Sequence, residues 1–332
     1  MNSFDTGYNA AQSAAALFDL DDWTSLRATG KDAVKFLQNF CTNDIQKLPA
    51  GEGCEAFLTN VKARVLAHVL IYHRADDGSL QLLTSPAQAV PIIGHLDRYI
   101  ITEDVTVADQ THSHGLLGLV GPRAEEILRS AGATTPTAAA PHRFATITTE
   151  LAGQAVTISS FDGLNLPAYL IETALDAVEP INDRLIAEGA ASCELDVFNS
   201  LRVEAVYPWG GFDVNEEHLA PEVDRPWAIS LDKGCYLGQE PIARIDALGH
   251  VNRLLRGLRL EEEFIPEPQS PIFDGEKRVG EIRSTATSGR DGNVIALAFM
   301  RASHAATGTQ VTVRSGELES DATVYNAKTP EH

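Results

Sequence analysis

The 332 residues carry a formal net charge of −20, with 44% hydrophobic and 22% charged residues. This composition is typical of a soluble globular protein of two or three domains, and the acidic excess argues against binding of nucleic acid or anionic lipid, because phosphate recognition needs a cationic surface. We expect no signal peptide and no membrane span, since no apolar run approaches the roughly 20 residues that cross a bilayer.

The four cysteines are scattered along the chain at Cys41, Cys54, Cys193 and Cys235. They form no C-x-x-C pair, so we expect no closed zinc site and assign no metal ligands. Few, scattered cysteines in an acidic chain are typical of a cytoplasmic protein with free thiols.

The first three quarters of the chain predict a mixture of helices and strands. Apolar residues at helical spacing predict helices over 33–40, 86–99, 124–130 and 174–188. Short runs rich in β-branched and aromatic residues, bounded by turn residues, predict strands over 55–58, 64–72, 80–84, 105–107, 115–120, 144–149, 155–159 and 168–171. Residues 131–142 are rich in Ala, Thr and Pro and predict a loose connection.

One thiol lies between an ammonium and a carboxylate in the octet Lys233-Gly234-Cys235-Tyr236-Leu237-Gly238-Gln239-Glu240. Pro241 suits a first helical turn and Glu240 suits the positive end of a helix dipole, so we expect a helix to begin near Gln239. Cys235 would then lie just before a helix N-terminus and close to Lys233. Both neighbours favour a thiolate, as in reactive cysteines. The alternative is a buried, inert cysteine in a glycine turn.

The pattern changes after Leu248. Short strands separated by Gly-containing turns are predicted at 255–260, 272–273, 278–284, 294–300, 310–314 and 322–325. Strands of this length and spacing predict a small antiparallel barrel. We therefore divide the chain into a first region, residues 1–248, and a barrel domain, residues 249–332.

The octet resembles the signature K-G-C-[aromatic]-x-G-Q-E of YgfZ-like folate-binding proteins, which are relatives of the glycine-cleavage T-protein (aminomethyltransferase). Residues 30–44 are similar to the T-protein pattern G-x-D-A-x-x-F-L-Q-x-x-x-T-N-D, and Leu201–Ala205 to its L-R-x-E-A segment. The resemblance runs from about Asp19 to Tyr325. It implies an α+β fold: a cloverleaf of two α+β portions, interleaved in sequence or not, plus a C-terminal antiparallel β-barrel.

The resemblance also implies a ligand, tetrahydrofolate or a derivative, in a central hole. Trp227 falls where T-proteins place an indole beside folate, and Asn165 falls where they carry a glutamate that contacts the pterin. Trp227 and Tyr236 could supply flat surface, while Arg202 or Lys233 could meet the glutamyl carboxylates. The octet adds two further candidate ligand contacts, Gln239 and Glu240. The alternatives are a salt-bridge arginine for Arg202 and a core indole for Trp227.

One segment departs from the family pattern. T-proteins carry L-N-x-x-G-G-x-x-D-D-L, whose second Asp is the catalytic carboxylate, and here the two aspartates become Ala67 and His68. His68 could serve as a catalytic proton carrier, since imidazole titrates near neutral pH, or it could be an ordinary strand histidine. The lost carboxylate moves the interpretation away from aminomethyl transfer.

Three hypotheses follow from these residues. The leading one is a tetrahydrofolate-binding factor that supports assembly or repair of iron–sulfur proteins, its clients, with Cys235 as the functional thiol. The second is a tetrahydrofolate-dependent enzyme, an aminomethyltransferase or demethylase. The third is a module that senses folate without a reactive thiol. A single cysteine supplies too few ligands for a conventional cluster site, so any cluster contact would be shared.

Overall fold

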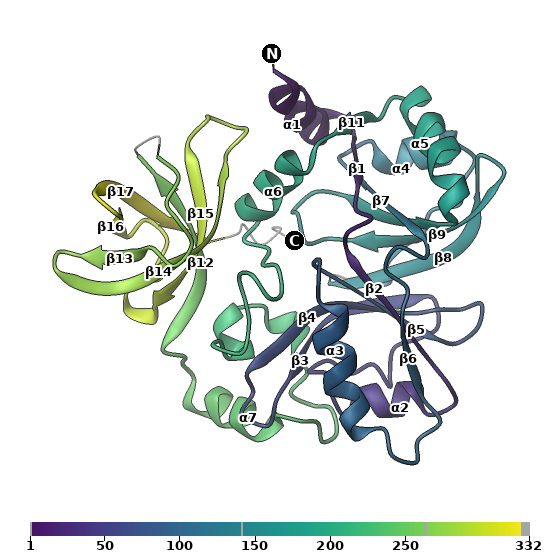
Figure 1. The fold of residues 1–332 in the computed structure, drawn as a ribbon, viewed down its shortest axis with the longest axis horizontal. Coiled ribbons are helices and arrows are strands. Elements are labelled where there is room, and N and C mark those ends of the chain that lie inside the picture. Colours follow the sequence, from purple (N-terminus) through teal and green to yellow (C-terminus); the bar gives the residue numbers. More distant parts are fainter. Residues whose placement is uncertain (1, 141, 262–263, 327–332) are drawn as a thin grey trace.

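The computed structural model describes residues 2–140, 142–261 and 264–326. Two sheet-and-helix portions lie together, and a barrel lies to one side of them (Figure 1). The helices are α1 (Ser3–Ser13), α2 (Ala33–Gln38), α3 (Ala89–Leu96), α4 (Ala124–Ser130), α5 (Val178–Ala187), α6 (Leu195–Glu204) and α7 (Gln239–Leu248), with short 3₁₀ turns η1 (Asp97–Tyr99), η2 (Leu175–Ala177), η3 (Ala220–Val223), η4 (Pro226–Ala228) and η5 (Ala302–His304).

A continuous eleven-stranded sheet joins the two α+β portions. Its order is β11 (Ala191–Cys193), β1 (Ala16–Asp19), β7 (Gly115–Val120), β10 (Ala168–Thr173), β9 (Gln154–Phe161), β8 (Arg143–Leu151), β3 (Glu52–Thr59), β4 (Val65–His73), β5 (Leu80–Thr84), β2 (Thr24–Thr29) and β6 (Thr106–Asp109). One half of the sheet consists of β1 and β7 to β11. The other half consists of β2 to β6, which lie between β1 and β7 in the sequence. The two halves are therefore interleaved in sequence.

The two half-sheets meet where β3 pairs antiparallel with β8. Only three residues of β3 take part, and Cys54 of β3 pairs with Arg143 of β8. Glu55 follows the last paired residue of β3, and His142 precedes the first paired residue of β8. Residues 55 and 142 are thus brought to one place by the junction between the half-sheets.

Apolar side chains fill the space between the sheet and its helices. One cluster lies under α2 and α3 and includes Phe36, Leu37 and Ile92, all buried. No element is predicted over residues 3–13, but the structure forms α1 there. The Asn2 side chain accepts a hydrogen bond from the Asp5 amide (2.8 Å), which caps the helix N-terminus.

The C-terminal strands close into a barrel, as predicted. Its order is β12 (Arg253–Leu260), β15 (Val294–Arg301), β14 (Lys277–Thr287), β13 (Pro271–Asp274), β16 (Gln310–Ser315) and β17 (Leu318–Tyr325). Alternate residues of these strands, such as Leu258, Ile282 and Val313, point inward and are fully buried. The prediction of α+β portions with a C-terminal antiparallel barrel is confirmed.

The helix expected near Gln239 is also confirmed, since α7 begins at that residue (Figure 1). Gly238 precedes it with φ of 88°, a conformation that favours glycine. A Cβ atom there would lie 2.6 Å from the Asn60 carbonyl oxygen. The octet therefore packs tightly against the turn that joins β3 to β4.

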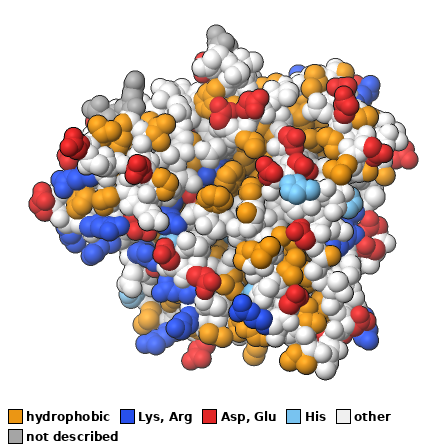
Figure 2. Space-filling view, in the orientation of Figure 1, with side chains coloured by type: hydrophobic (Ala, Val, Ile, Leu, Met, Phe, Trp, Pro, Cys, Tyr) orange, Lys and Arg blue, Asp and Glu red, His pale blue; other side chains and the backbone are white. Residues whose placement is uncertain are grey.

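The surface carries the acidic excess of the sequence. On the face shown in Figure 2, acidic side chains are spread over both the sheet region and the barrel, and a group of Lys and Arg side chains lies on the barrel. All four cysteines are free thiols, as expected. Within the described residues, no helix has the length and apolar character required to cross a membrane.

Candidate functional site

A buried carboxylate, Glu55, organises the junction between the half-sheets. In the β3–β4 ladder Phe57 pairs with His68, so Glu55, two residues before Phe57, lies on the same sheet face as His68. Glu55 accepts hydrogen bonds from His68 Nε2 (2.5 Å), from the indole Nε1 of Trp227 (2.9 Å) and from Nη2 of Arg225 (2.7 Å). A second bond comes from Nε of Arg225. These partners offset the cost of burying the charge.

The charged neighbours keep Glu55 ionised. Burial alone would raise the pKa of Glu55, but the charges of Arg225 and His68 outweigh burial and hold that pKa well below its usual range. A carboxylate so strongly paired is a poor proton acceptor. Glu55 is therefore an anchor for Arg225 and Trp227.

The His68 ring faces other groups of the protein. The side chain is buried, Nε2 faces Glu55, and Nδ1 lies 3.2 Å from the Pro208 carbonyl oxygen. Both ring nitrogens face acceptors, which only the imidazolium form satisfies in full. The proton-carrier role expected for His68 is therefore corrected: its ring nitrogens are both engaged within the protein.

Trp227, in η4, forms one wall of a cavity of about 210 Å³. The ring centroids of Trp227 and His142 lie 4.2 Å apart with planes within 8° of parallel. The Arg225 guanidinium lies 4.7 Å from the indole centroid, and His142 Nδ1 lies 3.4 Å from the Asp162 carboxylate. The cavity lining also includes Asn165, Val206, Val223 and Leu255. Of the residues predicted to meet a ligand, Trp227 and Asn165 thus line the same cavity.

Asn165 reaches the cavity from the turn between β9 and β10. Its φ is 55°, in the left-handed region that asparagine tolerates better than most residues. The turn Asp162-Gly163-Leu164-Asn165 therefore directs two polar residues, Asp162 and Asn165, to the cavity lining.

A larger cavity of about 490 Å³ shares the segment Asp224–Pro226 in its wall. Most of its other lining residues are apolar, among them Ile229 after η4, Ile242 and Ile245 of α7, and Leu254 of β12. It contains neither Trp227 nor Asn165. Of the residues expected at a ligand, Trp227 and Asn165 therefore line the smaller cavity and none lines the larger one.

The structure corrects the ligand contact expected for Arg202, on α6. The side chain is 2% exposed, and its guanidinium donates to Asp213 (2.8 Å), to the Tyr207 carbonyl (3.3 Å) and to the Ser284 hydroxyl of the barrel (2.9 Å). It also lies over the Trp209 ring, 4.1 Å from the centroid. Arg202 is a buried ion-pair residue, because packing of α6 on the barrel encloses it.

Two octet residues are likewise structural. The Lys233 ammonium donates to the carbonyls of Gln38 (2.7 Å), Cys41 (2.8 Å) and Asn43 (2.7 Å), at the end of α2. All three donors of the ammonium are therefore used by backbone carbonyls near the end of α2. The contact with a ligand and the stabilisation of a Cys235 thiolate that were expected of Lys233 are not seen. Tyr236 is buried beneath it, with the ammonium 4.9 Å from the ring centroid, so the flat surface expected there is covered.

The remaining octet residues lie apart from the cavity lining. Cys235 is exposed in the loop before α7, which overturns the alternative of a buried thiol. Gln239 is half-buried at the start of α7, and Glu240 is exposed in its first turn. Neither lines the cavity beside Trp227.

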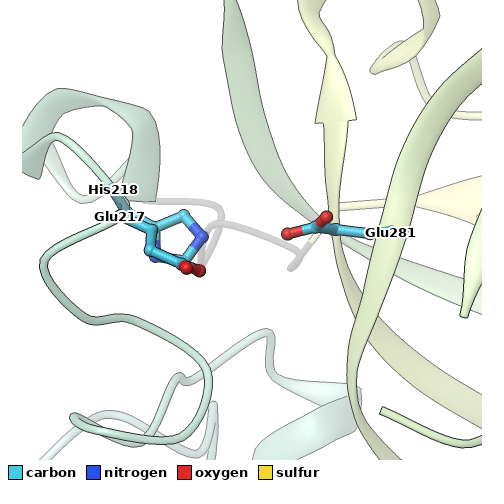
Figure 3. A group of neighbouring side chains, drawn as sticks. All are labelled: Glu217, His218 and Glu281. Atoms are coloured by element: carbon cyan, nitrogen blue, oxygen red, sulfur yellow. The ribbon is translucent and has the colours of Figure 1, made fainter. Parts of the chain in front are cut away.

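A group of possible metal ligands lies between the sheet region and the barrel. Figure 3 shows Glu281 pointing from the barrel toward Glu217 and His218, whose ligand atoms lie within 4.8 Å of one another. His218 Nδ1 accepts from the Asn215 amide (3.3 Å), so its proton is on Nε2, and burial with nearby arginines lowers the pKa of His218 to about 3. Arg283 Nη1 lies 3.6 Å from Glu281. The two carboxylates of this group are therefore paired with Arg283, and His218 is neutral.

Sequence reasoning missed Glu55, Arg225 and His142. Glu55 had a usable signal, since it is a single acidic residue within the apolar strand segment Cys54–Leu58. A charge in such a position must find a buried partner. Arg225 and His142 had no comparable signal, because their partners are distant in sequence.

The chain matches known families over most of its length. Residues 2–233 match the GCVT N-terminal domain, and residues 253–330 match the Glycine cleavage T-protein C-terminal barrel domain. The crystal structure of glycine cleavage system aminomethyltransferase T from Bartonella henselae has the same fold, with a TM-score of 0.83 at 18% identity, over 97% of this chain and 88% of that one.

Curated relatives align over nearly the whole chain. An aminomethyltransferase of Symbiobacterium thermophilum is 26% identical over 315 residues, covering 92% of this chain and 84% of the relative. An aminomethyltransferase of Herpetosiphon aurantiacus is 27% identical over 330 residues, covering 97% and 88%. A putative chloroplastic transferase of Arabidopsis thaliana is 27% identical over 315 residues, covering 93% and 70%.

Proposed function

Because this chain belongs to the glycine cleavage T-protein family, we propose that it binds a reduced folate, tetrahydrofolate or a derivative, in the cavity beside Trp227. The observation that carries the proposal is the meeting of Trp227 and Asn165 in one cavity lining. An indole suits the flat pteridine ring, and the amide of Asn165 with the carboxylate of Asp162 suits its polar edge.

Titration with tetrahydrofolate tests this proposal. Trp227→Ala and Asn165→Ala should weaken binding, whereas Trp209→Phe, which changes an indole stacked on Arg202, should not. At a ligand concentration 100 times the Kd, binding should raise the free energy of unfolding by about 2.7 kcal/mol. Failure of the wild-type protein to bind at high ligand concentration would contradict the proposal.

The first use of the folate is aminomethyl transfer, which the names of the curated bacterial relatives favour. His68 stands where the resemblance places the catalytic carboxylate, and its ring is engaged by Glu55. Asp162 is a carboxylate in the cavity lining and would take the proton-handling role. We expect methylene-tetrahydrofolate to form from an aminomethylated lipoyl carrier, and Asp162→Asn to abolish it. No product with the wild-type protein would exclude this use.

A second use is support of iron–sulfur proteins, and one observation favours it. Cys235 is exposed, and it lies in the octet that resembles the YgfZ signature. In cells that lack the native protein, Cys235→Ser should bind folate yet fail to restore iron–sulfur enzyme activity. Cys193→Ser, a change at a half-buried thiol, should restore it. Full rescue by Cys235→Ser would contradict this use.

A further inference from the structure

The indole that is proposed to receive the pteridine already has a stacked partner. His142 lies parallel to Trp227 with 4.2 Å between ring centroids. This separation is that of two rings in direct contact, so a third flat ring does not fit between them. A ligand that stacks on this face of Trp227 must take the place of the imidazole.

The other group over the indole is much harder to move. Arg225 lies 4.7 Å from the indole centroid, is buried, and donates two hydrogen bonds to Glu55. Moving its guanidinium would leave the Glu55 carboxylate buried without that partner, which is costly. The indole itself is fixed to Glu55 through Nε1.

His142 is held far more weakly. Its side chain is 26% exposed, and its ion-pair partner Asp162, 3.4 Å from Nδ1, is 43% exposed. An ion pair that reaches solvent contributes little, because water screens it. Among the described residues, His142 and Arg225 lie over Trp227, and of these two only His142 can therefore leave at small cost.

We propose that His142 occupies the pteridine place in the ligand-free protein and is displaced when reduced folate binds, so that it lowers the affinity of the site. The inference rests on the proposed folate function. Displacement frees the Trp227 face for the pteridine, and it also frees the Asp162 carboxylate, which lines the same cavity, for the polar edge of the ligand.

The affinity of His142→Ala for tetrahydrofolate tests the inference. The loss of one stacked pair should tighten binding roughly two- to tenfold. His112→Ala is a matched control, because His112 also has a positive φ (62°, against 55° for His142) and also lies 3.4 Å from an aspartate, Asp21, but is fully outside the cavity lining. The control variant should bind tetrahydrofolate as the wild-type protein does.

A second measurement follows the imidazole directly. The Cε1 proton of His142, assigned by its absence from the spectrum of His142→Ala, should be shielded by the Trp227 ring in the free protein. Saturating tetrahydrofolate should remove that shielding. Equal or weaker binding by His142→Ala, or a Cε1 proton that stays shielded when folate is bound, would overturn the inference while leaving folate binding intact. Absence of binding by both proteins would instead contradict the proposed function, and the inference with it.

Discussion

At the scale of single residues, Glu55 fixes the positions of the side chains that surround it at the site. It holds Arg225 and Trp227 in place with its two oxygens, and it engages His68 from the neighbouring strand. A carboxylate with this many charged and hydrogen-bonding partners fixes geometry, so the shape of the cavity wall depends on one buried side chain.

Glu55→Gln should lower the free energy of unfolding at pH 7 by about 3 kcal/mol, because it leaves Arg225 buried without a charged partner. The pKa of Glu55 is depressed in the folded protein. Its stabilising contribution is therefore complete above the ordinary glutamate pKa, about 4.3, and is lost as the pH falls further below that value.

Denaturant unfolding at several pH values checks this prediction. The difference between wild type and Glu55→Gln should shrink as the pH falls below about 4.3, because protonated glutamate resembles glutamine. Glu150→Gln, at an exposed glutamate on β8, serves as the control. A difference that stays constant from neutral to acid pH would show that Glu55 acts through packing and not through its charge.

At the scale of elements, the octet is mainly a structural joint between α2, the β3–β4 turn and α7. Lys233 binds the carbonyls at the end of α2, and the Leu237 amide donates to the Asn39 carbonyl (2.8 Å). The Thr59 hydroxyl of β3 donates to the Leu237 carbonyl (2.6 Å). These contacts present Cys235 to solvent at a defined place before α7.

Gly238→Ala should destabilise the protein more than Gly249→Ala. Both glycines flank α7 with positive φ, 88° and 72°, so both substitutions carry the backbone cost of about 1 kcal/mol. At residue 238 the added Cβ would also lie 2.6 Å from the Asn60 carbonyl oxygen, whereas at residue 249 it meets nothing within 4 Å. Thermal melts of the two variants measure the difference. An equal loss of stability in both would mean that the β3–β4 turn moves to make room for the added Cβ.

Cys235 should be the first thiol to react with an alkylating reagent, because it is the exposed one. Burial raises the pKa of Cys193 to about 11 and also raises the pKa values of Cys41 and Cys54. Limited labelling followed by peptide mapping should modify peptide 234–244 before any other, and Cys41 and Cys54 only after unfolding. Early modification of Cys41 would show that the octet opens in solution.

At the scale of the whole molecule, α6 connects the sheet region to the barrel. Arg202 of α6 donates to Asp213 and to Ser284 of β14, and Asn199 of α6 donates to the Thr285 carbonyl (3.0 Å). The cavity beside Trp227 takes lining residues from both regions, including Leu255 of β12. The relative placement of sheet and barrel therefore sets the width of the cavity.

Arg202→Ala should lower the free energy of unfolding by about 3 kcal/mol or more, since it leaves Asp213 charged and buried. Arg123→Ala, which removes an exposed ion pair with Glu126, should change stability little. Chemical denaturation measures both, and folate titration of the folded Arg202→Ala protein measures its affinity. Unchanged stability with lost folate affinity would restore the ligand role that the sequence predicted.

The amino-acid sequence by itself determined part of the local structure, the barrel strands and α7 among it but not α1, and its family resemblance implied the architecture. Hydrophobic periodicity and turn chemistry depend on neighbouring residues, so the barrel strands and the start of α7 at Gln239 were predictable. From the sequence, Arg202 and Trp227 could each be a ligand contact or a structural residue. Only the tertiary structure shows that the Arg202 side chain is buried in an ion pair and that Trp227 lines a cavity, because burial depends on which elements pack together. Glu55 and Arg225 are 170 residues apart and meet because the segment that contains η4 packs against β3, which no local pattern encodes.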